Sequence, residues 1–258
     1  MSASTRRAAY LQALGIDQWV ARPPDTPGVS GAAPGAAERL PEARAVPPQP
    51  TTSRDSPIEP NAQAWARLQE EVRVCTRCAL HQTRTQAVFG VGNPEADWMV
   101  IGEAPGAEED RRGEPFVGRA GQLLDAMLRA IGLSRETNVY IANILKSRPP
   151  GNRDPRPEEI AACLPYLHRQ IALVRPRLLL AVGRIAAQNL LQTDLPLGRL
   201  RGRVHPYGEL NVPLVVTYHP AYLLRSPADK RKAWEDLKFA RSVFTQTMNP
   251  EANHGHRS

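Results

Sequence analysis

The 258-residue sequence has only three cysteines, few aromatic residues and no long apolar run. Three is an odd number and too few for the disulfide framework of a small secreted domain, so we expect a role for the cysteines in packing or metal binding. No segment approaches the roughly 20 apolar residues that span a bilayer. The N-terminus also lacks the apolar run and cleavage site of a secretory signal. We therefore expect a cytoplasmic protein that does not enter a membrane.

What the chain does have is positive charge and enough apolar residues for a core. Its 33 Lys and Arg outnumber 26 Asp and Glu, which gives a formal net charge of +7. A basic protein attracts polyanions before any specific contact forms, so nucleic acid is the first partner to consider, although ribosomal and membrane-surface proteins share this balance. The length and an apolar content of 41% suit one sizeable domain.

Proline divides the chain into segments. Residues 1–20 place apolar side chains near helical spacing and predict a short amphipathic helix, which either docks on a protein partner or packs loosely on its own domain. Ten of the 25 prolines lie between residues 21 and 60. We predict a disordered linker over 21–62, because such a segment buries too little apolar surface to offset its ordering entropy. The predicted domain covers 63–248, followed by a disordered tail over 249–258.

Short apolar runs alternate with helical patterns inside the predicted domain. Strands are predicted at 97–103, 138–145, 177–183 and 212–219, and the helical patterns include 120–132, 157–174, 184–191 and 228–247. This alternation predicts an α/β fold of three layers, α/β/α, with a mostly parallel central sheet. Ligands bind such sheets beyond the carboxyl ends of the strands. The loops after Ile101, Ile144 and Tyr218 are therefore the candidate site.

Each of these loops holds polar or aromatic side chains with more than one interpretation. The loop after Ile101 is far longer than the usual strand-to-helix connection of about two to six residues, which argues for function. Its Glu103 is either a site group or a solvated acid. Its Phe116 is either a site group or an aromatic residue of the core. Asn143 ends a buried strand, where an amide either brackets a loop or recognises the hydrogen-bonding edge of a ligand. His219 follows a buried strand and is either a packed core histidine or a site group.

Three motifs occur in register along the domain. They are "GEAPGAEEDRRGEPFVGRAGQLLD", "NILKSRPPGNR" and "HPAYLLR". Together they closely resemble the family 4 uracil-DNA glycosylases of the uracil-DNA glycosylase superfamily, over roughly residues 70–246. The resemblance implies a DNA repair glycosylase that hydrolyses the N-glycosidic bond of uracil in DNA and leaves an abasic site. Its implied partner is DNA containing uracil, and we expect a monomer.

The resemblance also implies roles in a pocket for a flipped-out base. Phe116 would stack on the uracil, and Asn143 would recognise its edge, accepting from N3–H and donating to O4. Cytosine presents the opposite pattern and would leave these groups unpaired. Glu109 is the candidate for a steric block against thymine. His219 would donate to uracil O2 as negative charge develops, and Glu103 would face C1′, stabilise the cationic sugar and orient water.

Further residues are expected at the DNA. Three basic side chains would contact phosphates beside the pocket, with solvated surface charge as the alternative for each: Lys146, Arg148 and Arg153. Three residues after the histidine would form the wedge that fills the gap left by the base: Leu223, Leu224 and Arg225.

Family 4 enzymes hold a [4Fe–4S] cluster on four cysteines. Here Cys75, Cys78 and Cys163 match three of the four positions, and Ser147 stands at the other. Thiolate is the usual ligand of such clusters. The sequence leaves several outcomes open: a cluster completed by the serine, by a histidine such as His81 or His168 or by water; a zinc ion; or loss of the cofactor.

Two other functions occur among proteins with this kind of fold. One is the branch of the superfamily that bonds covalently to its product site, which is marked by a basic insertion ending in histidine before the proline-rich loop; "LKSRPPGNR" lacks that insertion. The other is a non-catalytic DNA-binding accessory module of replication or repair with the same fold. The joint presence of the four pocket residues argues against it.

Overall fold

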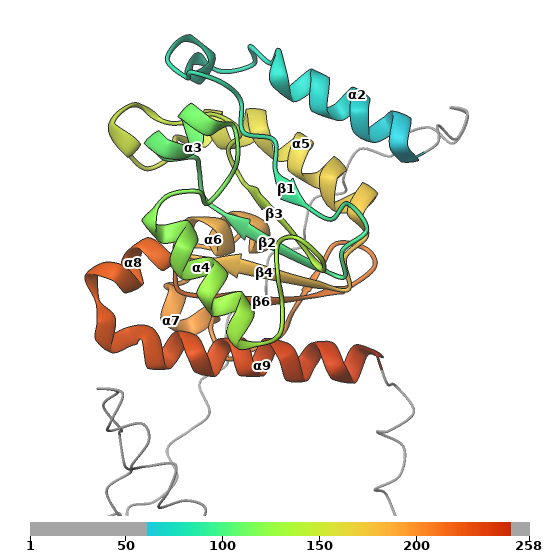
Figure 1. The fold of residues 1–258 in the computed structure, drawn as a ribbon, viewed down its shortest axis with the longest axis vertical. Coiled ribbons are helices and arrows are strands. Elements are labelled where there is room, and N and C mark those ends of the chain that lie inside the picture. The colour runs from blue at the N-terminus through green and yellow to red at the C-terminus, as the bar shows by residue number, and fades with distance from the viewer. Residues whose placement is uncertain (1–60, 249–258) are drawn as a thin grey trace, which may run out of the picture. The chain divides into compact units, whose positions relative to one another are not determined.

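The computed structural model describes residues 61–248. The predictions for the helix at 1–20, for nearly all of the linker and for the tail lie outside the described residues. Six strands form one sheet in the order β1-β3-β2-β4-β6-β5 (Figure 1). In chain order they are β1 (Val91–Gly92), β2 (Trp98–Gly102), β3 (Val139–Asn143), β4 (Leu178–Val182), β5 (His205–Tyr207) and β6 (Val212–Thr217).

The four central strands are parallel, as the apolar runs predicted. β2 pairs with β3 on one side and with β4 on the other, and β6 pairs with β4. The two edge strands, β1 and β5, run antiparallel to their neighbours. They were not predicted, because two or three residues are too short to show an alternating pattern and β5 contains Pro206.

Eight α-helices in the described range connect or cover the strands. They are α2 (Asn61–Arg73), α3 (Ala107–Arg112), α4 (Arg119–Ala130), α5 (Pro157–Val174), α6 (Arg184–Leu191), α7 (Leu197–Leu200), α8 (Pro220–Arg225) and α9 (Lys230–Met248). Short 3₁₀ turns occur at Ala79–Gln82, Pro150–Asn152 and Pro227–Asp229. The start of α5 follows from its sequence, since Pro157 suits a first turn and Glu159 accepts a hydrogen bond from the backbone N–H of Arg156 over 2.9 Å.

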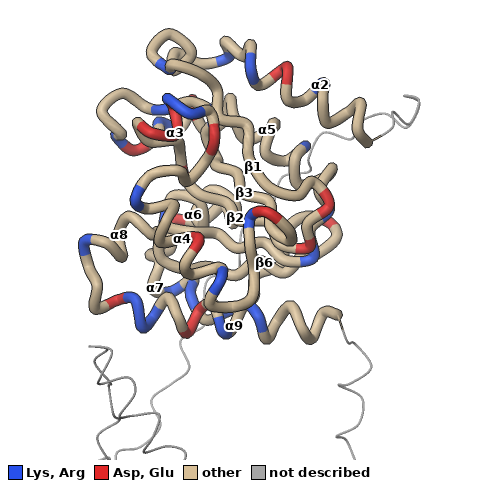
Figure 2. The backbone as a smooth tube through the Cα atoms, in the orientation of Figure 1, with Lys and Arg blue, Asp and Glu red and all other residues tan. Residues whose placement is uncertain are grey.

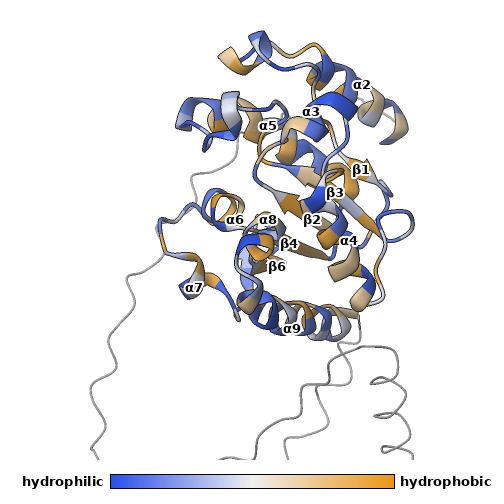
Figure 3. Ribbon diagram, turned by 60° about the vertical axis from the view of Figure 1, so that its left-hand side comes forward, coloured by the Kyte–Doolittle hydropathy of each residue, from blue (hydrophilic) through white to orange (hydrophobic). Residues whose placement is uncertain are grey.

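The side chains of the strands alternate between two apolar layers. In β2, Met99 and Ile101 pack with residues of α5 and α6, whereas Trp98 and Val100 pack with residues of α4 and α9. Figure 3 shows hydrophobic residues concentrated in the central strands and hydrophilic residues on much of α9. Helices therefore cover both faces of the sheet, and the predicted three-layer α/β/α fold is confirmed. None of the described helices is long and apolar enough to cross a bilayer.

Because the central strands are parallel, the predicted loops all follow the carboxyl ends of strands on the same side of the sheet. Gly102 and Asn143 are paired across β2 and β3. The pairing continues into the loops, because the carbonyl oxygens of Gly102 and Glu103 accept hydrogen bonds from the N–H groups of Ile144 and Leu145. The loops after β2 and β3 thus begin side by side.

Candidate active site

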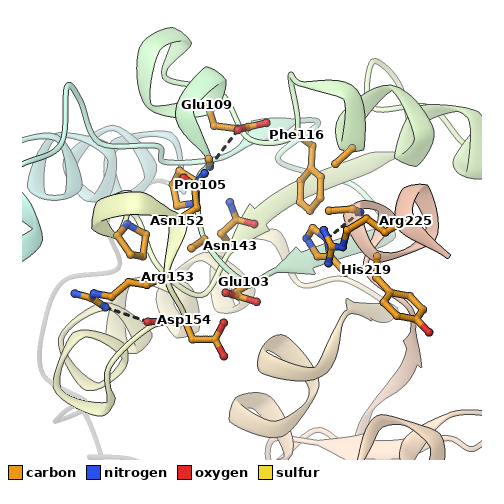
Figure 4. A pocket seen from close by; sticks show the side chains of 16 residues that line it. Glu103, Pro105, Glu109, Phe116, Asn143, Asn152, Arg153, Asp154, His219 and Arg225 are labelled. Atoms are coloured by element: carbon orange, nitrogen blue, oxygen red, sulfur yellow. Dashed lines mark hydrogen bonds between the residues drawn. The ribbon is translucent and has the colours of Figure 1, made fainter.

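A cavity of about 420 Å³ lies where the loops after β2, β3 and β6 meet (Figure 4). Its walls include seven of the side chains singled out in the sequence: Glu103, Glu109, Phe116, Asn143, Arg153, His219 and Arg225. The structure therefore brings residues from three separate loops into one pocket.

Asn143 forms one wall and carries an unpaired acceptor. The residue is 2% exposed, and its Oδ1 atom has no hydrogen-bond donor among the described residues. Opposite it, a Cβ atom at Gly102 would lie 2.4 Å from this Oδ1 and 2.6 Å from Cζ of Phe116. Glycine at this strand end leaves space between the amide and the aromatic ring. A buried acceptor without a hydrogen-bond donor raises the free energy of the folded protein. An N–H group of a ligand could supply the missing hydrogen bond.

The ring of Phe116 lies beside that of His219, with 5.5 Å between the ring centroids and 33° between the planes. The loop that carries Phe116 is held by Glu109, whose carboxylate accepts hydrogen bonds from the N–H groups of Gly106, Val117 and Gly118 over 3.0 to 3.1 Å. The sequence did not indicate this structural role of Glu109. Its role against thymine stays a prediction.

His219 is the N-cap of α8, and its Nδ1 accepts a hydrogen bond from the N–H of Ala221 over 3.1 Å. Because Nδ1 accepts, the proton of the neutral ring is assigned to Nε2. The pKa of His219 is lowered to about 4, chiefly by burial and also by the nearby Arg225, while Glu109 opposes this shift. The imidazole is therefore a neutral donor at physiological pH.

Glu103 directly follows β2 and is partly buried in the cavity wall. The pKa of Glu103 is raised to about 7, chiefly by burial and also by the carboxylate of Asp154, while Arg184 opposes this shift. Asp154 and Arg184 form an ion pair at 2.9 Å. Neither residue was singled out in the sequence, where Asp154 resembles an ordinary acid of a proline-rich turn.

Two predicted DNA contacts are wrong. Lys146 is 2% exposed, and its Nζ donates to Oε1 of Gln170 over 2.6 Å and to the carbonyl of Asn143 over 2.8 Å, so it does not reach a phosphate. Leu223 is 1% exposed and packs in the core. Successive residues of a helix point about 100° apart. For this reason Leu223 faces inward while Leu224, at 38% exposed, faces out.

The other basic candidates lie near the cavity but have protein partners. Arg153 pairs with Glu159 at 2.5 Å, and Nε of Arg148 donates to Oδ1 of Asn152 over 2.8 Å. Figure 2 shows Lys and Arg at the end of α8 and along the first turns of α9. Contacts of Arg148, Arg153, Leu224 and Arg225 with DNA stay predictions.

The three cysteines, Cys75, Cys78 and Cys163, lie outside the cavity lining. Cys163 is buried on α5, and its pKa is raised chiefly by burial, while Lys146 opposes this shift and the thiols of Cys78 and Cys75 add to it. At the fourth position the Oγ of Ser147 accepts a hydrogen bond from Nη1 of Arg84 over 2.9 Å. Within residues 61–248, no three or more His, Cys, Asp or Glu side chains are placed to hold a metal ion. The residues present therefore do not fit a cluster held by four thiolates.

A model of the uracil-DNA glycosylase superfamily matches residues 89–238. The chain belongs to this superfamily. It is 46% identical over 175 residues to a type-4 uracil-DNA glycosylase of Archaeoglobus fulgidus, an alignment that covers 65% of this chain and 87% of the relative. A type-4 enzyme of Thermotoga maritima is 42% identical over 181 residues, 69% of this chain and 93% of the relative. A type-5 uracil-DNA glycosylase of Thermus thermophilus is 36% identical over 176 residues, an alignment that covers 62% of this chain and 77% of the relative. The resemblance to family 4 that the motifs indicated is confirmed.

Proposed function

We propose that the protein is a DNA repair glycosylase that hydrolyses the N-glycosidic bond of a flipped-out uracil and leaves an abasic site. The observation that carries the proposal is the unpaired Oδ1 of Asn143, buried in a cavity beside an aromatic ring and a neutral imidazole. A buried acceptor without a donor costs about 1–3 kcal/mol, which a ligand N–H would offset. Uracil offers such a donor at N3. The type-4 relatives support the same substrate.

Recognition follows from the amide of Asn143. Its Oδ1 accepts from N3–H, and its Nδ2 donates to O4, while the ring of Phe116 covers one face of the base. Cytosine has an acceptor at N3 and a donor at N4, so the same amide would face two unpaired contacts. A site built on such hydrogen bonds rejects the wrong ligand by about 10⁴-fold or more. Uracil is therefore favoured over cytosine when Oδ1 of this amide faces N3 of the base.

The chemistry uses His219 and Glu103. When the bond between C1′ and N1 breaks, its electron pair stays on the uracil, and the negative charge spreads to O2. Nε2–H of His219 donates a hydrogen bond to that oxygen. The carboxylate of Glu103 stabilises the positive charge at C1′ and accepts a proton from the attacking water, whose oxygen bonds to C1′. A base with a pKa of about 7 suits proton transfer near neutral pH.

The DNA would be held at the rim of the cavity. Leu224 is exposed on α8, next to Arg225, and we expect these two residues to fill the gap that the flipped base leaves. Arg148 and Arg153 on the proline-rich loop are the candidates for phosphate contacts. None of these steps uses Cys75, Cys78, Cys163 or Ser147.

A cleavage assay on a uracil-containing oligonucleotide tests the proposal. The wild type should release uracil and leave an abasic site, and Asn143→Ala should lower kcat/KM by about 10²-fold or more. Asn189→Ala is the matched control, because Asn189 lies on α6 and donates its amide to the carbonyl of Ile185. Absence of uracil release by the wild type, or undiminished release by Asn143→Ala, would refute the proposal.

A further inference from the structure

We infer that Arg135 is a positioning residue for base recognition, because its guanidinium holds the backbone of Phe116 in the conformation that aims the ring into the cavity. The inference rests on the proposed function and adds a residue that does not line the cavity. Three observations support it: the backbone conformation of Phe116, the position of its carbonyl group, and the hydrogen bonds of Arg135.

Phe116 has an unusual backbone. Its φ is +54°, in the left-handed region that a residue with a Cβ seldom adopts, and the residue is 6% exposed. Its carbonyl oxygen presses against α4, where a Cβ atom at position 121 would lie 1.7 Å away. The close approach is possible only because residue 121 is glycine. A backbone in this conformation persists only when its surroundings hold it.

Arg135 supplies that support on the carbonyl side. Nη2 donates to the carbonyl of Phe116 over 2.9 Å, and Nη1 donates to the carbonyl of Pro115 over 3.2 Å. Nε donates to Oδ1 of Asp125 on α4 over 2.8 Å, and the arginine side chain is only 14% exposed. The planar guanidinium makes these bonds at once, which the single ammonium of a lysine cannot do in the same geometry.

Glu109 supplies support on the other side. Its Oε1 accepts from the N–H groups of Val117 and Gly118, the two residues that follow Phe116. A cation thus holds the carbonyl groups at 115 and 116, and an anion holds the N–H groups at 117 and 118. The ring orientation is fixed before the base arrives, so binding does not have to order it.

Inhibition by free uracil tests the inference, because it reports on the base pocket without DNA contacts. Arg135→Gln should weaken inhibition by uracil about tenfold, within the range of base stacking on an aromatic ring. Its affinity for DNA with an abasic-site analogue, which lacks the base, should change less than about twofold. Arg129→Gln is the matched control: it removes one positive charge from the same surface, at the end of α4, and should behave as wild type.

A double-mutant cycle separates positioning from general stabilisation. If Arg135 acts through Phe116, then Arg135→Gln should have no further effect on uracil inhibition in a Phe116→Ala background. Equal effects in both backgrounds, or equal effects of Arg135→Gln and Arg129→Gln, would overturn the inference. Should Arg135→Gln fail to fold, Arg135→Lys keeps the charge and should still weaken inhibition by uracil about threefold; wild-type inhibition of that variant would refute the inference.

The outcome also separates this inference from the function on which it rests. A wild type that is inhibited by uracil, together with an unaffected Arg135→Gln, refutes the role of Arg135 alone. A wild type that neither releases uracil nor is inhibited by it refutes the proposed function.

Discussion

Arg84 and Ser147 are 63 positions apart in the sequence, and Nη1 of the arginine donates a hydrogen bond to Oγ of the serine over 2.9 Å. Nη2 of the same arginine donates to the carbonyl of Arg73 at the end of α2. These bonds tie the segment with Cys75 and Cys78 to the start of the proline-rich loop. They link the two parts of the chain that a four-cysteine cluster would also link.

Ser147→Cys is expected to raise the iron bound per chain, because it completes a set of four thiols. Iron and sulfide analysis of anaerobically purified wild type, Ser147→Cys and Ser147→Ala provides the measurement, and the alanine variant controls for loss of the hydroxyl. Uracil release by the wild type should be unchanged after treatment with an iron chelator, since no cysteine lines the cavity. Equal iron in all three proteins would contradict the first expectation.

The pH dependence of kcat/KM should show the ionisation of Glu103. Its raised pKa, about 7, means that the carboxyl is protonated below this pH, so kcat/KM should fall as the pH drops below about 7. Asp154→Asn removes a negative charge that raises this pKa, so the fall should move to lower pH. His219, with a pKa of about 4, should add no step above about pH 5.

The measurement is a pH series of kcat/KM for wild type and Asp154→Asn. Asp194→Asn serves as the control, because that exposed acid lies after α6 and outside the cavity lining. Superimposable profiles for Asp154→Asn and the wild type would show that Asp154 does not act on Glu103.

Adjacent leucines on α8 should behave in opposite ways. Leu223→Ala should lower the free energy of unfolding by about 2–5 kcal/mol, because it leaves a cavity in the core. Leu224→Ala should change that free energy by less than about 1 kcal/mol, yet slow uracil release from duplex DNA more than from single strands. Denaturant unfolding and the duplex-to-single-strand ratio of kcat/KM check both. An unchanged ratio for Leu224→Ala would exclude it as the wedge.

Gly102→Ala should block the pocket without unfolding the domain. Its methyl group would lie 2.4 Å from Oδ1 of Asn143 and 2.6 Å from Cζ of Phe116, where the base must enter. We expect inhibition by free uracil to weaken at least about tenfold, with circular dichroism like that of the wild type. Normal inhibition would place the base elsewhere in the cavity. Gly198→Ala is the control, since a Cβ there meets no atom within 4 Å.

The parallel core was predictable because each central strand is a continuous apolar run between loops. The region of the pocket was predictable for a related reason: the carboxyl ends of parallel strands lie on the same side of the sheet, so Asn143 and His219 were expected on that side, and both line the cavity. The direction of a side chain was not predictable. Lys146 looks like a loop cation and Leu223 looks like its neighbour Leu224, but burial of each depends on packing that only the folded chain defines.

The role of a residue that acts through another residue is even harder to predict from the sequence. Arg135 contacts backbone carbonyls, and Asp154 influences the pKa of another carboxyl, so neither needs a motif. The positive φ of Phe116 also has no local signal, because that region usually favours glycine and the position is occupied by an aromatic residue.

The hydrogen bond from Ala221 to Nδ1 of His219 has a consequence for the catalytic cycle. A neutral imidazole holds its single N–H too tightly to transfer it to a leaving base. Uracil would depart as an anion and gain its hydrogen from solvent later, while the histidine ends each turnover as it began. No regeneration step is then needed at this ring before the next substrate binds.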